Sequence, residues 1–112
     1  MKKTKRARLE ANGWRVGSAQ EFLGLSAEEA ALVETKLRLS RAVRERRARL
    51  AQSQAALAKR LNSSQSRVAK MEAADPTVSV DLLLKALFAL GATPRDVATA
   101  IRTPLSLSLI HI

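Results

Sequence analysis

Side chains that can exchange hydrogen bonds with a partner gather between Gln54 and Lys70. At about 100° per residue, a helix that begins after Ser64 turns Val68 and Met71 toward the protein interior. Ser66, Ala69 and Lys70 point the other way, flanked by Gln65 and Arg67, so the outward side is small, polar or basic. Glutamine pairs well with adenine, and lysine and arginine pair with guanine. These residue types therefore indicate hydrogen bonding to a nucleic acid, although each of them taken alone is an ordinary solvated side chain.

Catalytic and metal-binding groups are scarce in the sequence. The chain has no cysteine, and its one histidine is His111. A thiolate site, a histidine pair or a Ser-His-Asp triad within one chain is therefore excluded. The acids Glu28, Glu29 and Glu34 lie near one another, but they open a helix, where capping explains them. We predict no enzymatic activity, no metal and no cofactor.

Positive charge is concentrated in part of the chain. The net charge is +10, and residues 36–70 alone hold eleven Lys or Arg and one acid. Such a concentration is typical of a protein with a polyanionic partner. The alternative is a solvated surface that keeps the protein soluble.

The sequence predicts one all-α domain of about five helices. Ser26 and Glu29 form a capping box, so a long helix is expected from Ala27 to about Arg49. Its apolar face is expected to be Leu32, Leu39, Val43 and Leu50, and its other sides carry Lys36, Arg38, Arg41, Arg44, Arg46, Arg47 and Arg49. Short helices should follow at 54–61, with Ser53 as N-cap, and at 64–74, with Asn62 in the turn between them and Asp75-Pro76 as the stop.

Two further helices complete the expected bundle. One begins at Ser79 or Asp81 and ends before Gly91, and it is apolar on more than one side, which favours contact with the core and with a partner. The last begins at Thr93, with Pro94 at its first position, and runs to about Arg102.

The two ends of the chain differ from this bundle. Residues 1–25 form a basic segment, which is either an arm that touches phosphate or a solvated terminus, and residues 26–102 form the domain. The tail 103–112 is apolar and resembles a translated sequencing adapter, so we expect it to be foreign to the protein; the alternative is an edge strand that pairs between subunits. We find no signal peptide and no membrane span, and we expect a cytoplasmic protein.

The residues between 53 and 72 resemble a known family. They resemble the XRE (Cro/cI-like) helix-turn-helix of phage repressors and bacterial regulators. The residues that carry the resemblance are Ser53-Gln54, Leu57-Ala58, Leu61-Asn62, Ser64 to Val68 and Met71-Glu72. The eleven-residue interval from Gln54 to Gln65 matches that family's two glutamines, and the resemblance covers roughly residues 38–91. The sequence departs from the family at Gln52, Asn62 and Ser63. The resemblance implies a lambda-repressor-like bundle that binds double-stranded DNA.

The same resemblance implies a role for each candidate residue. Gln54 would donate to a phosphate, Ser64 would begin the reading helix, and Gln65 and Ser66 would reach base edges. Lys70 lies farther along that face, Ala69 would touch a thymine methyl group, and Arg67 would contact phosphate. Glu72 is expected to make a structural bond to backbone or to arginine.

Three functions remain open at this point. The first is a sequence-specific transcriptional regulator that acts as a homodimer on a palindromic operator. The second is an antitoxin that neutralises a toxin encoded beside it, because Gly13-Trp14 and the stretches 21–25, 72–76 and 80–83 are similar to HigA-type antitoxins; the toxin would contact Trp14 to Leu25 or the long helix. The third is a basic nucleic-acid binder without sequence preference.

Overall fold

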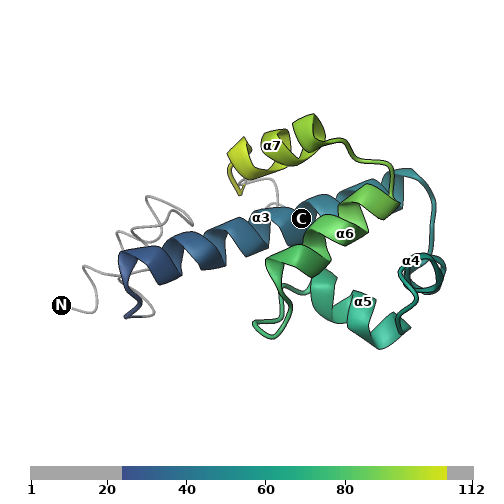
Figure 1. Ribbon diagram of the computed structural model, residues 1–112, viewed down its shortest axis with the longest axis horizontal. Helices are drawn as coiled ribbons and strands as arrows, with labels where there is room; N and C mark the ends of the chain where they lie inside the picture. Colours follow the sequence, from purple (N-terminus) through teal and green to yellow (C-terminus); the bar gives the residue numbers. More distant parts are fainter. Residues whose placement is uncertain (1–23, 106–112) are drawn as a thin grey trace. The chain divides into compact units, whose positions relative to one another are not determined.

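The computed structural model of the chain describes residues 24–105 and contains five α-helices in that range (Figure 1). With the labels of Figure 1, these are α3 (Ala27–Arg49), α4 (Gln54–Arg60), α5 (Gln65–Glu72), α6 (Val80–Ala89) and α7 (Pro94–Arg102). No strand occurs among residues 24–105, so the predicted all-α helix-turn-helix bundle is confirmed. Residues 36–104 form one compact unit, which holds the core and the site; residues 24–35 belong to a second unit and are described by themselves.

Every one of these helices begins at a serine or threonine that caps it. Ser26 and Glu29 form the predicted reciprocal box, with N···O distances of 3.0 and 3.1 Å. The hydroxyls of Ser53 and Ser64 accept from the backbone N–H three residues later, at 3.0 and 3.2 Å. Ser79, not Asp81, caps α6 in the same way, and Thr93 and Asp96 form a second capping box. Since each cap satisfies a backbone donor that the helix itself leaves unpaired, the five starts follow from local sequence.

The ends of α3, α4, α5 and α6 repeat one hydrogen-bond pattern. After α4, the N–H of Ser63 bonds to the carbonyl of Ala58 at 2.8 Å, and that of Asn62 bonds to Lys59 at 3.1 Å. This Schellman pattern needs a residue with positive φ, and the four that supply it are Ala51, Asn62, Ala74 and Gly91. Asn62 was predicted in this role. Because Ala74 already leaves the helical conformation, α5 ends at Glu72, two residues before the predicted limit of 74.

Alanine is an unfavourable choice at two of these turns. Ala51 and Ala74 have φ of 55° and 56°, where a Cβ crowds the following carbonyl and glycine does not. We expect Ala51→Gly to raise the free energy of unfolding by about 0.5–1 kcal/mol, measured by urea denaturation. The matched control is Ala48→Gly, inside α3, which should lower stability by about the same amount. Destabilisation by Ala51→Gly would contradict this account of the turn.

The core is aliphatic and lies between α3, α4, α5 and α6. Leu39 and Val43 from α3, Leu57 from α4, and Val68 and Met71 from α5 are all completely inaccessible to solvent. The remaining members come from α4, α6 and the turn before α6: Ala58, Val78, Leu83, Ala86, Leu87 and Leu90. The prediction of the apolar face of α3 was wrong at its two ends, because Leu32 and Leu50 are about half exposed. Leu50 follows the last residue of α3, and Leu32 lies about two turns before the first core residue.

Most predictions for the two chain ends concern residues outside the described range. Trp14, Phe22, most of the basic segment 1–25 and the alternating part of the tail, 106–112, lie outside the described residues. Of the segment expected to be foreign, residues 103–105 are described, and Arg41 donates to the carbonyl oxygens of Thr103 and Pro104, at 3.0 and 2.8 Å. Among residues 24–105, no helix is both long and apolar enough to cross a bilayer.

Candidate nucleic-acid interface

The helices α4 and α5 form a helix-turn-helix unit whose geometry depends on small and apolar residues. Ala58 is nearly inaccessible on α4, and a small side chain there lets the two helices approach closely. Asn62 supplies the left-handed turn between them. Val68 and Met71 face the core, as the helical projection predicted. Figure 1 shows α5 beside α4 along the lower edge of the bundle.

The outer face of α5 is open to solvent. Gln65, Ser66, Arg67 and Lys70 are exposed, and Ala69 is half-buried, so the predicted reading residues lie together on this face. Ser64 is exposed as well, but its hydroxyl caps the helix and lies 3.3 Å from the Ser66 hydroxyl. The two hydroxyls can therefore share one hydrogen bond, which orients both of them at the start of α5.

A hollow of about 330 Å³ runs along one side of α5. It is lined by Ser64, Ser66, Arg67 and Lys70, and by Thr77, Val78 and Leu82 from the following turn and α6. Its lining has two cations and three hydroxyls and no carboxylate, a set that suits an anionic oxygen. The sequence prediction did not include Thr77, and the signal that could have found it is the polar turn that follows α5.

Asp75 organises this turn without lining the hollow. Its Oδ1 accepts from both the hydroxyl and the backbone N–H of Thr77, at 2.5 and 2.8 Å. These hydrogen bonds, with a smaller contribution from the charge of Lys70, hold the pKa of the Asp75 carboxyl below its ordinary value. The residue is therefore an anion that is already satisfied by its own turn.

A polar cluster fixes α5 to α3 and α4. Glu72 accepts two hydrogen bonds from the guanidinium of Arg47, one of them 2.9 Å long, and its side chain is 5% exposed. The amide nitrogen of Gln54 donates to the same carboxylate at 3.1 Å, and Arg47 also donates to the carbonyl of Gln52 at 2.8 Å. The predicted structural bond of Glu72 is thus confirmed. Gln54, the predicted phosphate contact, gives one amide hydrogen to Glu72 and keeps a second for a partner.

The charge state of Glu72 follows from this cluster. Burial works to raise its pKa, but the hydrogen bonds from Arg47 and Gln54 and the positive charges of Arg47 and Arg44 outweigh burial, so the pKa lies below its ordinary value. Hydrogen bonding to Glu72 raises the pKa of Arg47 in turn. The pair is therefore ionised at neutral pH, and the cluster holds the start of α4 and the end of α5 together.

Most of the basic residues on α3 are bound within the fold, which revises the interpretation of the charge concentration. Five of the seven donate hydrogen bonds to protein oxygens: Lys36 to Pro76, Arg38 to Ile101, Arg41 to Thr103 and Pro104, Arg46 to Gly91 and Asp96, and Arg47 to Glu72 and Gln52. Arg44 and Arg49 are left exposed. Much of the positive charge of α3 therefore holds the bundle together, and the exposed cations on α4 and α5, namely Lys59, Arg60, Arg67 and Lys70, carry more of the surface charge than the sequence indicated.

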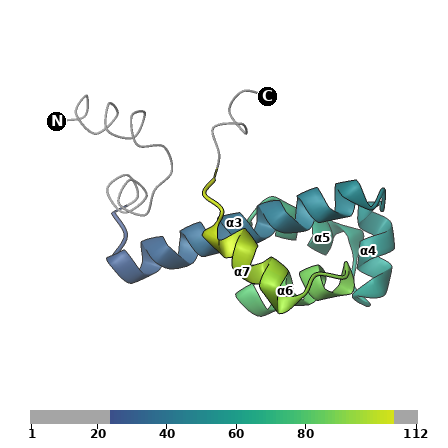
Figure 2. The same cartoon turned by 90° about the horizontal axis from the view of Figure 1, so that it is seen from above.

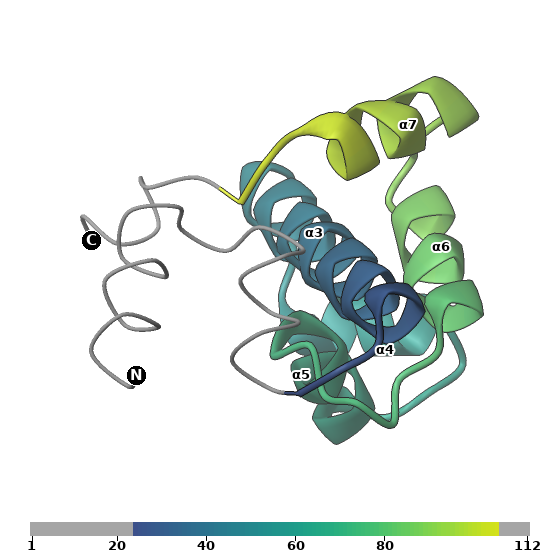
Figure 3. The same ribbon diagram turned by 90° about the vertical axis from the view of Figure 1, so that its left-hand side faces the viewer.

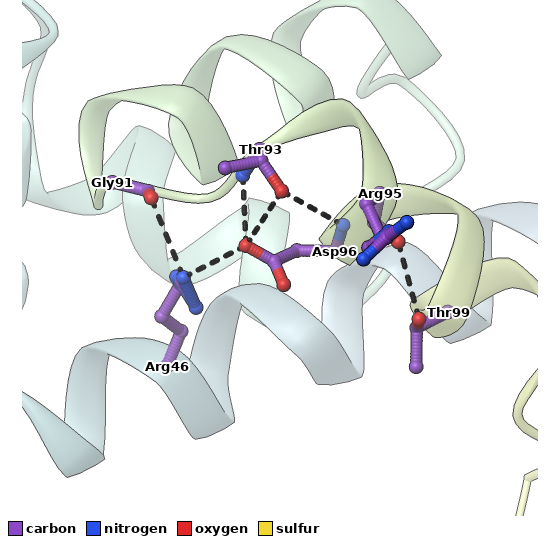
Figure 4. Close-up of polar contacts among 6 residues, drawn as sticks. All are labelled: Arg46, Gly91, Thr93, Arg95, Asp96 and Thr99. Carbon is purple, nitrogen blue, oxygen red and sulfur yellow. Dashed lines mark hydrogen bonds and ion pairs between the residues drawn. The ribbon is translucent and has the colours of Figure 1, made fainter.

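The contact between Arg46 and the start of α7 is drawn in Figure 4. The Arg46 guanidinium donates to Asp96 at 3.3 Å and to the carbonyl of Gly91 at 3.4 Å. The same Asp96 oxygen accepts from the backbone N–H and the hydroxyl of Thr93, and these bonds, together with the smaller effects of Arg46 and Arg49, lower its pKa. Arg46 thus reaches the helix cap directly and ties α7 to α3.

Within residues 24–105, no group of three or more His, Asp or Glu side chains could hold a metal ion. The groups that α5 offers a partner are an amide, a hydroxyl and two cations on its exposed face. That set, carried on the second helix of a helix-turn-helix, defines a DNA-binding class of protein.

Comparison with known proteins supports the same class. Residues 38–100 match the family described as a helix-turn-helix domain, which is more than half of the chain. The chain therefore belongs to this helix-turn-helix family. No curated protein and no solved structure matches it.

Proposed function

We propose that this protein is a sequence-specific transcriptional regulator that places α5 in the major groove of DNA and acts as a homodimer on a palindromic operator. The observation that carries this proposal is the division of α5 into two faces. Val68 and Met71 are fully buried, while Gln65, Ser66, Arg67 and Lys70 are all exposed on the other side. A helix with that division can be held rigidly by the core and still present polar groups to base edges.

The roles of the candidate residues follow from their positions. Gln65 and Ser66 lie in the first turn of α5, the part of a recognition helix that reaches base edges, and Ala69 leaves room for a thymine methyl group. Lys70 lies one turn farther along the same face. Arg67 and the second amide hydrogen of Gln54 suit backbone phosphate, as does the hollow that Thr77 helps to line. Within this assignment, Ser64 serves mainly as the cap that starts the helix.

The assignment predicts different outcomes for Gln65 and Arg67. After the preferred sequence is obtained by in vitro selection of bound DNA, Gln65→Ala should cost roughly 1–3 kcal/mol at one base position and relax the preference there. Arg67→Ala should weaken binding to all sequences alike, because a phosphate contact carries no sequence information. Both are measured by gel shift or fluorescence anisotropy on a panel of single-base variants.

Two results would count against this proposal. Unchanged base preference in Gln65→Ala would remove the reading role from that residue. Equal affinity of the wild-type protein for selected and random DNA would instead support the third possibility, a basic binder without sequence preference. Arg102→Ala, which removes an exposed cation on α7, is the matched control for loss of a positive charge away from α5.

Within the helix-turn-helix class, the Cro/cI-like subclass fits best. The two glutamines and the buried Ala58 lie in the two-helix unit formed by α4 and α5, and the Arg47–Glu72 bond joins that unit to α3. An antitoxin role is the second candidate. The observation that favours it is that α3 extends before the matched region, over residues 27–37, with Leu32 about half exposed. Copurification with the product of a neighbouring gene tests it, and loss of that complex in Leu32→Glu would assign the contact to α3.

A further inference from the structure

The outer face of α6 carries a stripe in which two opposite charges alternate with two apolar side chains. Asp81, Leu84, Lys85 and Phe88 are spaced at i, i+3, i+4 and i+7, so they form one stripe along the helix. Phe88 is 46% exposed, Leu84 is half-buried, and both charged residues are exposed. The core residues Leu83 and Leu87 lie on the opposite side of the same helix. Leu84 and Phe88 are therefore the apolar residues that the sequence predicted on a second side of this helix.

Three of the four stripe residues, Asp81, Lys85 and Phe88, are exposed, whereas Leu84 also packs against the core. Figures 2 and 3 show α6 at an edge of the helices, with α3 on its inner side. The polar residues that read DNA in the proposed function lie on a different helix, α5. A partner could therefore cover the stripe on α6 while Gln65 and Ser66 stay exposed.

The charges on the stripe are complementary to themselves under two-fold symmetry. In an interface between two copies related by a two-fold axis, a residue i that contacts j in the partner is matched by j contacting i. When two α6 helices pack antiparallel, the Asp81 end of each stripe lies against the half of the other stripe that carries Lys85 and Phe88. Within residues 24–105, neither of these side chains forms an ion pair. Both are thus available to a second copy.

We propose that the stripe formed by Asp81, Leu84, Lys85 and Phe88 is the surface through which two copies of this chain pair, with their α6 helices antiparallel. This inference rests on the homodimer of the proposed function and names the surface that makes it. The two Phe88 side chains and the two Leu84 side chains supply the apolar contact. The two Asp81–Lys85 pairs across the interface set the antiparallel direction.

A charge exchange tests the pairing without changing the apolar contact. Asp81→Lys leaves two lysines on the stripe, and Lys85→Asp leaves two aspartates, so each variant repels its own copy. We expect each to weaken self-association on the order of ten-fold, measured by analytical ultracentrifugation without DNA. An equimolar mixture should regain the wild-type affinity, because each lysine then faces an aspartate. An effect within one helix cannot produce this recovery, and a mixture that associates no better than the separate variants would overturn the proposal.

A second pair of variants separates the interface from DNA binding. Phe88→Glu should abolish the dimer, whereas Leu50→Glu, which changes an equally exposed side chain on another element, should not. On DNA, Phe88→Glu should keep wild-type affinity for a single half-site and lose the extra affinity for the palindrome. Circular dichroism confirms that both variants fold. The proposal would be overturned if Phe88→Glu still forms dimers, or if the wild-type chain stays monomeric and binds two half-sites independently. If the wild type does not bind a half-site at all, the DNA-binding function is overturned instead.

Discussion

Glu72→Gln is expected to lower the free energy of unfolding by about 3 kcal/mol, because it leaves the Arg47 guanidinium half-buried without its counter-charge. The side chains of Glu72 and Arg47 are 5% and 18% exposed, so water cannot replace the lost charge efficiently. Glutamine keeps the shape of the side chain and can still accept from Gln54. The variant therefore removes the charge and replaces one of the two oxygens that accept from Arg47 with a donor. Urea denaturation near neutral pH measures the effect.

The control for Glu72 is an exposed acid on α3. Glu45→Gln removes the same charge from a solvated position and should stay within about 0.5 kcal/mol of the wild type. If Glu72→Gln is as mild as this control, the cluster with Arg47 and Gln54 contributes little to the fold.

The same carboxylate makes stability depend on pH in a defined direction. The pKa of Glu72 in the folded protein lies below its ordinary value of 4.5, so the unfolded chain binds a proton more readily. Its contribution is complete above that ordinary value and is lost as the pH falls below it toward the folded pKa. The stability difference between the wild type and Glu72→Gln should accordingly be constant above about pH 6 and shrink below about pH 4.5. Asp75 and Asp96 have lowered pKa values as well, and they leave some pH dependence in the variant.

The second large effect is expected at Leu39. Leu39→Ala removes a completely buried side chain from the part of α3 that faces the core, and it should cost about 3 kcal/mol. Leu50 follows Val43 on the apolar face that was predicted from the sequence. Leu50→Ala should cost less than about 1 kcal/mol, since Leu50 is about half exposed. Thermal or urea unfolding of the two variants gives the comparison. Equal losses would mean that Leu50 is covered in solution.

Helix starts were predictable because each depends on a few neighbouring residues. Ser53, Ser64 and Thr93 act as caps where the sequence indicated, and the inward turn of Val68 and Met71 follows from helical periodicity alone. Helix ends were less predictable. Asn62 signals a left-handed turn by its residue type, whereas alanine normally favours helix, so nothing local marks the turn at Ala51 or Ala74.

Two features of the site depend on contacts between distant residues. Periodicity identified the apolar face of α3 but not how far the neighbouring helices cover it, which is why Leu32 and Leu50 were misassigned. The hydrogen-bond partners of the α3 cations could not be predicted from the sequence either, because Arg47 and Glu72 are 25 residues apart and come into contact only in the folded chain. The composition of the exposed face of α5 could be predicted, but the hydrogen bond from Gln54 to Glu72 could not.

The internal use of the α3 cations has a consequence for the counterions that DNA binding would release. Each phosphate neutralised by a lysine or arginine frees close to one condensed cation, and the logarithm of the binding constant falls with the logarithm of salt concentration in proportion. Lys36, Arg38, Arg41, Arg46 and Arg47 already donate to protein oxygens, so they contribute little to that release. The net charge of +10 therefore overstates the number of ions that this protein would displace on binding DNA.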